Sequence, residues 1–212
     1  MPFDPRDPHE GGPVTTEGPA PTKARLTLLL VHGRGASAED ILVLARELSL
    51  GDVAYVAPQA DGNTWYPYSF LAPLDQNEPG ISSALRVLAR TVDSLVEQGV
   101  DTTRVGLLGF SQGACLALEF AARHAARYAG VFALSGGLIG PPGTPRNYNG
   151  SFEGTPVFLG CSDRDPHIPL ERVKESAEVF RRMNAAVDER IYPRMGHTVN
   201  DDEVLAIRRV IA

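Results

Sequence analysis

Strand-like and helix-like segments alternate along almost the whole chain, and this order is the feature that most restricts its fold. Apolar runs rich in Val and Leu predict buried strands at 26–31, 53–57, 104–109, 130–135, 156–160 and 187–193. Apolar residues three and four positions apart predict helices at 38–50, around 85–96, at 115–128, at 170–184 and from residue 200 onward. Strands and helices in this order favour a mostly parallel sheet with helices on both faces.

Two of the expected helices begin with a capping-box pattern. Ser37 precedes Asp40 by three positions, and Asn200 precedes Glu203 by the same spacing. In such a box each side chain hydrogen-bonds the other residue's backbone N–H, so both pairs predict where a helix starts.

The chain has 212 residues, of which 43% are hydrophobic, and this is enough to bury one large core. Residues 1–21 are rich in Pro, Gly and Thr, so we expect an extended N-terminal arm there and a single domain over 22–212. At the end of the arm, 13–18 and 24–31 are candidates to pair as strands. The sequence contains no internal repeat that would indicate a second module.

Composition excludes several classes of protein. The formal net charge is −6 and the basic residues are scattered, so we expect no nucleic-acid partner. Apolar runs are far shorter than the roughly 20 residues of a transmembrane helix, and the first residues lack the features of a secretory signal. These features favour a cytoplasmic location. Two cysteines, Cys115 and Cys161, are too few for a disulfide framework, and we expect both to be buried.

Chemically active side chains follow the expected strands, at the edge where parallel sheets bind ligands. In chain order these residues are His32, Arg34, Ser111, Ser135, Asp163, Asp165 and His197. They include a nucleophile, two candidate acids and a base.

The stretch GFSQGA at 109–114 has the pattern Gly-x-Ser-x-Gly between an expected strand and an expected helix. This is the nucleophile elbow, a turn so tight that the neighbours of Ser111 must be small, and the serine becomes exposed at the sheet edge. The start of the following helix would stabilise negative charge at that point. An acid and then a histidine follow in the chain, which is the order found in α/β-hydrolases.

Of the five histidines, His197 is the best candidate for a general base. His9 lies in the arm, and His124 lies late in a helix. His32 begins an HGRG stretch in which we expect the backbone, and not the imidazole ring, to have the functional role. His167 is too close to the candidate acids to be their obvious partner, although it could line a pocket. Spacing alone leaves the acid open between Asp163 and Asp165.

Four stretches, LLLVHGRGAS, GFSQGA, DRDPHIP and MGHTVN, together resemble the phospholipase/carboxylesterase family of α/β-hydrolases. That family includes bacterial carboxylesterases and acyl-protein thioesterases. The resemblance extends from about residue 26 to residue 212, and the combination is far more specific than any single motif. It implies an α/β-hydrolase fold.

The resemblance also implies a role for individual residues. Ser111 would be the nucleophile, Asp165 the triad acid and His197 the base. The acid belongs to a D-x-x-V-P pattern in which this chain has Ile168 in place of valine. The backbone N–H groups of Arg34 and Gln112 would form the oxyanion hole.

Residues 58–80 depart most from the eukaryotic members of that family. We expect the large side chains of this segment to form one wall of the substrate pocket, which His167 could also line. These side chains are Trp65, Tyr66, Tyr68, Phe70 and Leu71. The alternative is that these side chains only pack the loop onto the sheet.

The expected function is that of a serine carboxylesterase acting on short- to medium-chain esters of small molecules, with thioesters and lysophospholipids also possible substrates. We expect neither a cofactor nor a metal. A dienelactone-hydrolase-like or peptidase-like activity on the same triad is one alternative, and a binding protein without turnover is another. The acyl group, the leaving group and the oligomeric state stay open.

Overall fold

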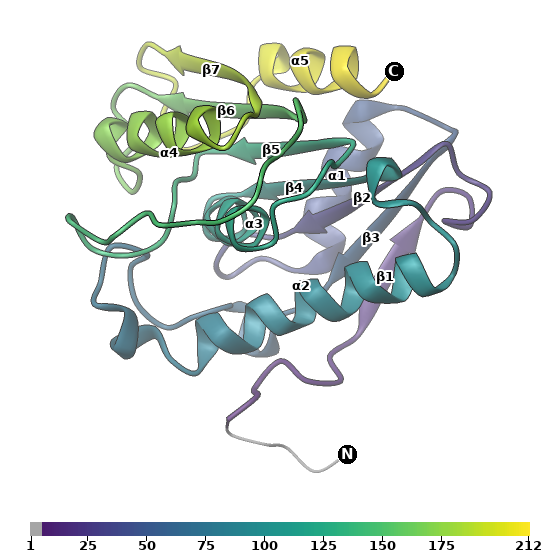
Figure 1. Ribbon diagram of the computed structural model, residues 1–212, viewed down its shortest axis with the longest axis horizontal. Coiled ribbons are helices and arrows are strands. Elements are labelled where there is room, and N and C mark those ends of the chain that lie inside the picture. Colours follow the sequence, from purple (N-terminus) through teal and green to yellow (C-terminus); the bar gives the residue numbers. More distant parts are fainter. Residues whose placement is uncertain (1–5) are drawn as a thin grey trace.

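A computed structural model describes residues 6–212 as a seven-stranded sheet flanked by five helices (Figure 1). The strand order is β1-β3-β2-β4-β5-β6-β7, and every neighbouring pair is parallel except β1 with β3. The strands are β1 (Val14–Glu17), β2 (Leu26–Val31), β3 (Val53–Pro58), β4 (Val105–Phe110), β5 (Gly130–Leu134), β6 (Pro156–Ser162) and β7 (Ala186–Tyr192). The expected mostly parallel sheet is therefore confirmed.

The helices cover the sheet on both faces because its central strands are apolar on both sides. The helices are α1 (Ala38–Leu48), α2 (Gly80–Glu97), α3 (Gln112–Arg123), α4 (Leu170–Arg182) and α5 (Asp201–Ile211). One core cluster joins α1 and α5 to the sheet, and a second cluster on the opposite face joins α2, α3 and α4. Strands β2 to β5 are buried almost throughout, as continuous Val/Leu-rich strands of a covered parallel sheet should be.

Both capping boxes form. The Ser37 side chain accepts from Asp40 N, and the Asn200 side chain accepts from Glu203 N, with the return bond present in each case. Helix α1 ends at Leu48, slightly earlier than expected, because Ser49 adopts a left-handed conformation with φ of 52°.

The pairing expected at the end of the N-terminal arm is wrong in one respect. Strand β1 pairs with β3, in the register Val14 to Pro58, and not with β2. Both edges of β2 are occupied, one by β3 and the other by β4, so the free edge of β3 is the position left for β1. Residues of the expected arm thus provide an edge strand of the sheet.

The segment between β3 and α2 is irregular and includes two short 3-10 turns, Asp61–Asn63 and Leu74–Asn77. It starts at the carboxyl end of β3, the edge from which the loops after β2, β4, β6 and β7 also leave the sheet. We call residues 59–79 the β3–α2 loop.

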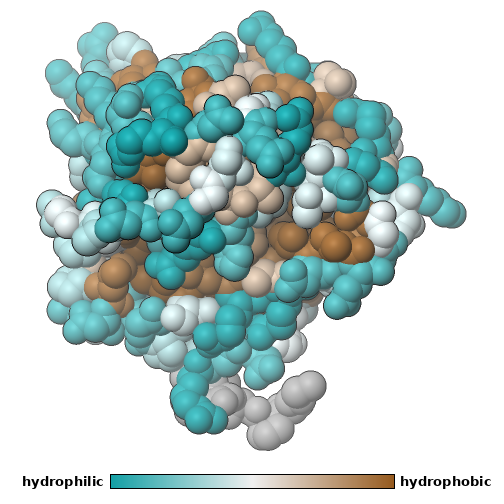
Figure 2. Space-filling view, in the orientation of Figure 1, coloured by the Kyte–Doolittle hydropathy of each residue, from teal (hydrophilic) through white to brown (hydrophobic). Residues whose placement is uncertain are grey.

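One face of the molecule is mostly polar (Figure 2). Figure 2 shows hydrophilic side chains over most of one face, with apolar side chains in patches between them. None of the helices within residues 6–212 is both long enough and apolar enough to cross a membrane.

Candidate active site

Ser111 lies in a strained turn between β4 and α3. It is the N-cap of α3, with φ of 56° and ψ of −119°, which is unusual for a residue with a side chain. The flanking glycines are required by close backbone contacts. A Cβ on Gly113 would lie 2.0 Å from Val31 O, and one on Gly109 would lie 2.4 Å from Gly113 C. The turn therefore presents the serine hydroxyl above the sheet edge at the start of a helix.

Ser111, His197 and Asp165 form one chain of hydrogen bonds, although they come from three separate loops. His197 Nε2 lies 2.8 Å from Ser111 Oγ, and His197 Nδ1 lies 2.7 Å from Asp165 Oδ2. An ionised carboxylate can only accept, so Nδ1 carries the proton and Nε2 is free to accept from the serine. This arrangement can remove a proton from Ser111 and stabilise the resulting imidazolium.

The Asp165 carboxylate is buried and well supplied with donors. Oδ1 accepts from the backbone N–H groups of His167 (2.8 Å) and Ile168 (3.0 Å), while Oδ2 binds His197. Burial alone would raise the pKa of this carboxyl, but the hydrogen bonds from His197 and the two backbone groups outweigh it and lower the pKa. Asp165 is thereby kept ionised beside the imidazole.

Asp163, the other candidate acid, has a different environment. Its Oδ1 accepts from Arg194 N at 2.7 Å, and its own N–H donates to Tyr192 O. It therefore fastens the loop that carries His197 and does not contact the imidazole itself.

The backbone of Gly33 and Arg34 runs beside the serine. A Cβ on Gly33 would lie 3.5 Å from Ser111 Cβ, so the chain after β2 approaches the turn closely. Within residues 6–212, no backbone acceptor binds the N–H of Arg34, and the N–H of Gln112 is unpaired at the first position of α3. Both N–H groups are thus available to a ligand at Ser111.

The side chains of Arg34 and Gln112 hold the β3–α2 loop in place. Arg34 donates to Pro67 O at 2.7 Å and to Tyr68 O at 2.5 Å, and its guanidinium lies over the Tyr66 ring. Gln112 Oε1 accepts from Trp65 N at 2.9 Å, and Nε2 donates to Tyr66 O at 2.8 Å. The residues whose backbones flank Ser111 therefore also position the neighbouring loop.

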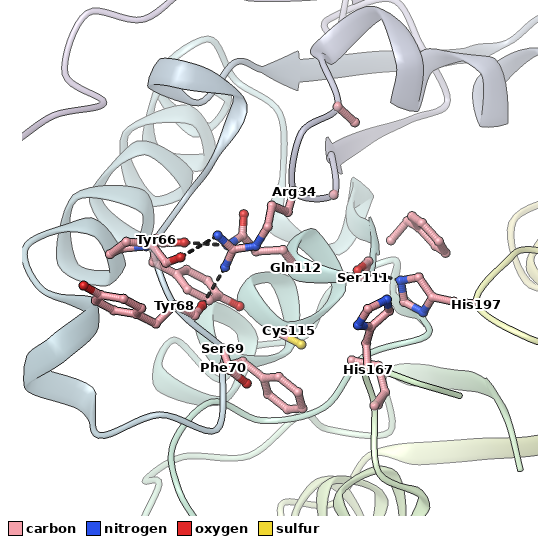
Figure 3. A pocket seen from close by; sticks show the side chains of 15 residues that line it. Arg34, Tyr66, Tyr68, Ser69, Phe70, Ser111, Gln112, Cys115, His167 and His197 are labelled. Carbon is pink, nitrogen blue, oxygen red and sulfur yellow. Dashed lines mark hydrogen bonds between the residues drawn. The ribbon is translucent and has the colours of Figure 1, made fainter. Parts of the chain in front are cut away.

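A cavity of about 580 Å³ opens at Ser111 (Figure 3). The expected pocket residues Tyr66, Tyr68, Phe70 and His167 line it, together with others that include Phe110, Cys115, Ile168 and His197. Its size is that of a small-molecule site. The His167 ring meets the His197 ring edge-on, with centroids 4.8 Å apart.

Leu71 does not line this cavity but packs, partly buried, against the core, so its expected place in the pocket wall is wrong. The same expectation is wrong for Trp65. Its side chain is fully buried behind the loop, where Nε1 donates to His32 O at 3.0 Å and the ring lies against His32. Trp65 packs the loop onto the sheet, the alternative considered above. The physical reason is that the indole N–H finds a buried backbone acceptor there.

Cys115 and Phe110 were missed as cavity residues. Cys115 follows Ser111 by four positions, so it lies on the same side of α3, and this spacing could have identified it. It is buried as expected, and burial raises the pKa of its thiol to about 12. The ring of Phe110, directly before the serine, lies 5.0 Å from that of His197.

Within residues 6–212, no three His, Cys, Asp or Glu side chains are grouped so that they could hold a metal ion. The cavity includes a serine hydroxyl hydrogen-bonded to one imidazole, a second imidazole beside the first, and backbone N–H donors. Such a site can transfer an acyl group.

Comparison with known proteins places the chain in a family. The profile of the phospholipase/carboxylesterase family matches residues 17–212. Among curated proteins, acyl-protein thioesterase 1 of Saccharomyces cerevisiae is 27% identical in an alignment 205 residues long that covers 85% of this chain and 89% of the yeast protein. Lysophospholipase-like protein 1 of Mus musculus is 23% identical over 84% of this chain and 82% of its own.

A solved structure is also similar. The phospholipase/carboxylesterase from Dyadobacter fermentans superimposes with a TM-score of 0.91 at 42% identity, over 95% of this chain and 96% of the other. The α/β-hydrolase fold expected from the sequence is thus confirmed. With a matching family profile over nearly its whole length, the chain belongs to the phospholipase/carboxylesterase family of hydrolases.

Proposed function

We propose that the protein is a serine carboxylesterase that hydrolyses short- to medium-chain esters of small molecules in the cytoplasm through an acyl-enzyme. The observation that carries this proposal is the continuous hydrogen-bond chain from Ser111 through His197 to Asp165. It ends at a cavity large enough for a small ester.

In the first half of the reaction, Ser111 Oγ attacks the ester carbonyl carbon while His197 Nε2 takes the hydroxyl proton. The backbone N–H groups of Arg34 and Gln112 stabilise the oxyanion, and Asp165 holds the imidazolium. His197 then gives the proton to the departing alcohol oxygen. The C–O bond to that oxygen breaks, leaving an ester on Ser111.

In the second half, water enters where the alcohol was. His197 removes a proton from this water as its oxygen attacks the acyl carbon, and the same two N–H groups stabilise the second oxyanion. The proton then passes from His197 to Ser111 Oγ as the bond between that oxygen and the acyl carbon breaks. The carboxylic acid leaves and the enzyme returns to its starting state.

The cavity walls support a preference for modest acyl chains. Phe70, Tyr66 and Ile168 provide apolar and aromatic surface near Ser111, whereas the exposed Tyr68 marks the rim. Relatives named acyl-protein thioesterases make a thioester the second candidate substrate on the same residues.

The test is a panel of p-nitrophenyl esters graded from acetate to decanoate, with an acyl thioester and a lysophospholipid beside them. We expect the highest kcat/KM among the shorter esters, and we expect Ser111→Ala to lower it by about 10⁶-fold, the loss typical of a triad serine. Ser135→Ala is the matched control, because Ser135 follows the adjacent strand β5 and also has a positive φ, of 52°. Activity of Ser111→Ala above a tenth of wild type would defeat the proposal.

A further inference from the structure

Residues 6–13, the described segment before β1, are held to the rest of the protein by buried contacts. His9 is only 4% exposed, and both of its ring nitrogens are used. Nε2 lies 2.8 Å from Trp65 O, and Nδ1 lies 3.1 Å from the backbone nitrogen of Asp61, which can only donate. His9 therefore binds two points of the β3–α2 loop, the segment that forms one wall of the active-site cavity.

The same segment is fastened to helix α2 from the other side. The carboxylate of Asp7 binds the Ser83 hydroxyl and pairs with Arg86 at 3.0 Å and Arg90 at 3.3 Å. His9 N also donates to Ser83 Oγ at 3.0 Å. These bonds fix the position of the His9 backbone relative to α2, and the imidazole is therefore held against the β3–α2 loop.

Trp65 links His9 to the residues that flank the nucleophile. The indole packs between the rings of His9 and His32, with centroid distances of 5.3 Å and 5.0 Å. Its backbone N–H donates to the Gln112 side chain, and its Nε1 donates to the carbonyl of His32, two residues before Arg34. Of the two proposed oxyanion donors, Gln112 N–H therefore belongs to a direct partner of Trp65, and Arg34 N–H lies two residues from the other partner, His32.

We propose that His9 is a positioning residue, which through Trp65 sets the two oxyanion-hole N–H groups and the cavity wall, and does so only while its imidazole is neutral. This inference rests on the proposed esterase function for the role of those N–H groups. A protonated imidazole could no longer accept from Asp61 N–H, so the loop would lose one of its two attachments.

The charges around His9 determine when it takes up a proton. Asp7 on its own segment and Asp61 on the loop favour the protonated form, whereas Arg86 and Arg90 on α2 neutralise Asp7, and the buried His32 beyond Trp65 adds no charge while neutral. Burial outweighs the acidic groups and lowers the pKa of His9 below its ordinary value of 6.5. The attachment is therefore intact at neutral pH and is lost on acidification.

Trp65 is the only tryptophan in the chain, so its fluorescence reports on this contact directly. An imidazolium quenches a neighbouring indole more strongly than a neutral imidazole does. We expect the tryptophan emission of the wild-type protein to fall on acidification, in a transition centred below pH 6.5. The secondary structure should stay unchanged through this transition. His9→Gln should lack the transition, and the control His124→Gln, at an exposed position at the end of α3, should keep it.

Persistence of the transition in His9→Gln would assign it to His32 and overturn the inference. Its absence from the wild-type protein would also overturn it.

Coupling to the active site is tested by reacting Ser111 with a fluorophosphonate and repeating the titration. The bound phosphonyl oxygen occupies the oxyanion hole, so it should favour the state with neutral His9 and shift the transition to lower pH, as linkage between two sites requires. An unchanged midpoint in the labelled protein would contradict the inference. Failure of Ser111 to react at all would instead contradict the proposed function.

Two substitutions separate the two bonds of His9. In His9→Gln, the amide nitrogen can take the place of Nε2 and donate to Trp65 O, but the bond from Asp61 N–H is lost. In His9→Asn, the amide oxygen can take the place of Nδ1 and accept from Asp61 N–H, but the bond to Trp65 O is lost. His9→Gln, like the protonated imidazole, keeps only the bond to Trp65 O, and we expect it to lower kcat, normalised to the sites that a fluorophosphonate labels, by about 10- to 100-fold, the loss typical of a small misplacement of catalytic groups. His9→Asn keeps only the bond from Asp61 N–H and should lower kcat by a similar factor. KM should change less than kcat in both variants. The concentration of active sites is counted by fluorophosphonate labelling of a separate sample. If both variants lose thermal stability but keep the wild-type kcat per active site, His9 only supports the fold.

Discussion

Asp163 and Asp165 follow β6 only two positions apart, and their hydrogen bonds give them different roles. Asp165 is turned inward, where it meets His197 and two backbone donors. Asp163 is exposed and accepts from Arg194 N. At the scale of single residues, the direction of one carboxylate decides which aspartate can support the imidazole.

We predict that Asp165→Asn lowers kcat/KM by about 10⁴-fold, because an amide at this position favours the tautomer of His197 that cannot accept from Ser111. Asp163→Asn should cost little, since the amide oxygen can still accept from Arg194 N. Ester hydrolysis by the two purified variants checks the difference. The reverse ranking would exchange the roles of the two residues.

Glu203 in α5 is a second residue whose surroundings matter more than its type. Oε2 accepts from Asn200 N in the capping box, while Oε1 is buried and has no partner within residues 6–212. Burial raises the pKa of this carboxyl from 4.5 to about 7. The folded protein thus holds a proton that the unfolded chain releases at lower pH.

Glu203 should therefore stabilise the fold fully below about pH 4.5 and lose this contribution as the pH rises through about 7. We predict that Glu203→Gln, which keeps the capping acceptor, is more stable than wild type at about pH 9 by up to about 3 kcal/mol. Denaturant unfolding at several pH values measures this, with the exposed Glu97→Gln as control. Parallel stability curves for wild type and Glu203→Gln would show that Glu203 does not titrate in this way.

At the scale of elements, the β4–α3 turn depends on glycines that allow two segments to touch. The carbonyls of Val31 and His32 approach Gly113 so closely that no side chain fits between them. This contact places the end of β2, and with it Gly33 and Arg34, beside Ser111. The turn and the HGRG segment therefore form one unit.

We predict that Gly113→Ala destabilises the fold by several kcal/mol, because its Cβ would overlap backbone atoms that cannot move independently. Gly51→Ala is the control, since a Cβ there meets nothing within 4 Å, and its effect should be within about 0.5 kcal/mol. Denaturant unfolding of both variants gives the comparison. Equal stabilities would mean that the turn tolerates a side chain.

The β3–α2 loop contains side chains of two kinds. Phe70 faces the cavity, with the Arg172 guanidinium 5.9 Å from the centre of its ring, whereas Trp65 is buried on the other side. Both are large and apolar, and the loop has no regular period, so the sequence pattern could not separate them. The hydrogen bonds of the Trp65 indole and backbone decide its orientation.

We predict that Phe70→Ala shifts the preference among p-nitrophenyl esters toward longer acyl chains, since each methylene accommodated in an apolar pocket changes discrimination by about 1–3 kcal/mol. Trp65→Phe should lower stability and overall kcat/KM while leaving the ratio between chain lengths unchanged. An altered ratio in Trp65→Phe, or an unaltered one in Phe70→Ala, would contradict these assignments.

At the scale of the whole molecule, much of the architecture could be predicted because it follows from local patterns. Strand and helix order, both capping boxes and the tight turn at Ser111 depend on neighbouring residues. Ser111, both aspartates and His197 follow parallel strands, so their meeting at one edge of the sheet could be expected, whereas the choice of Asp165 over Asp163 came from the family resemblance.

What could not be predicted depends on contacts between distant segments. Strand β1 pairs with β3 because β2 has no free edge, and this is a property of the whole sheet. His9 reaches Trp65 across 56 positions, and no local pattern distinguishes this histidine from an exposed one in a polar arm. The N-terminal segment therefore has to be seen in the structure before its contact with the active-site loop is recognised.

The most direct test of the central claim is to trap the nucleophile. After reaction with a fluorophosphonate, mass spectrometry of the intact protein and of its peptides should show one adduct, on Ser111, that forms much more slowly in Asp165→Asn and is absent from Ser111→Ala. An adduct on another residue, or equal labelling of wild type and Ser111→Ala, would show that Ser111 is not the nucleophile.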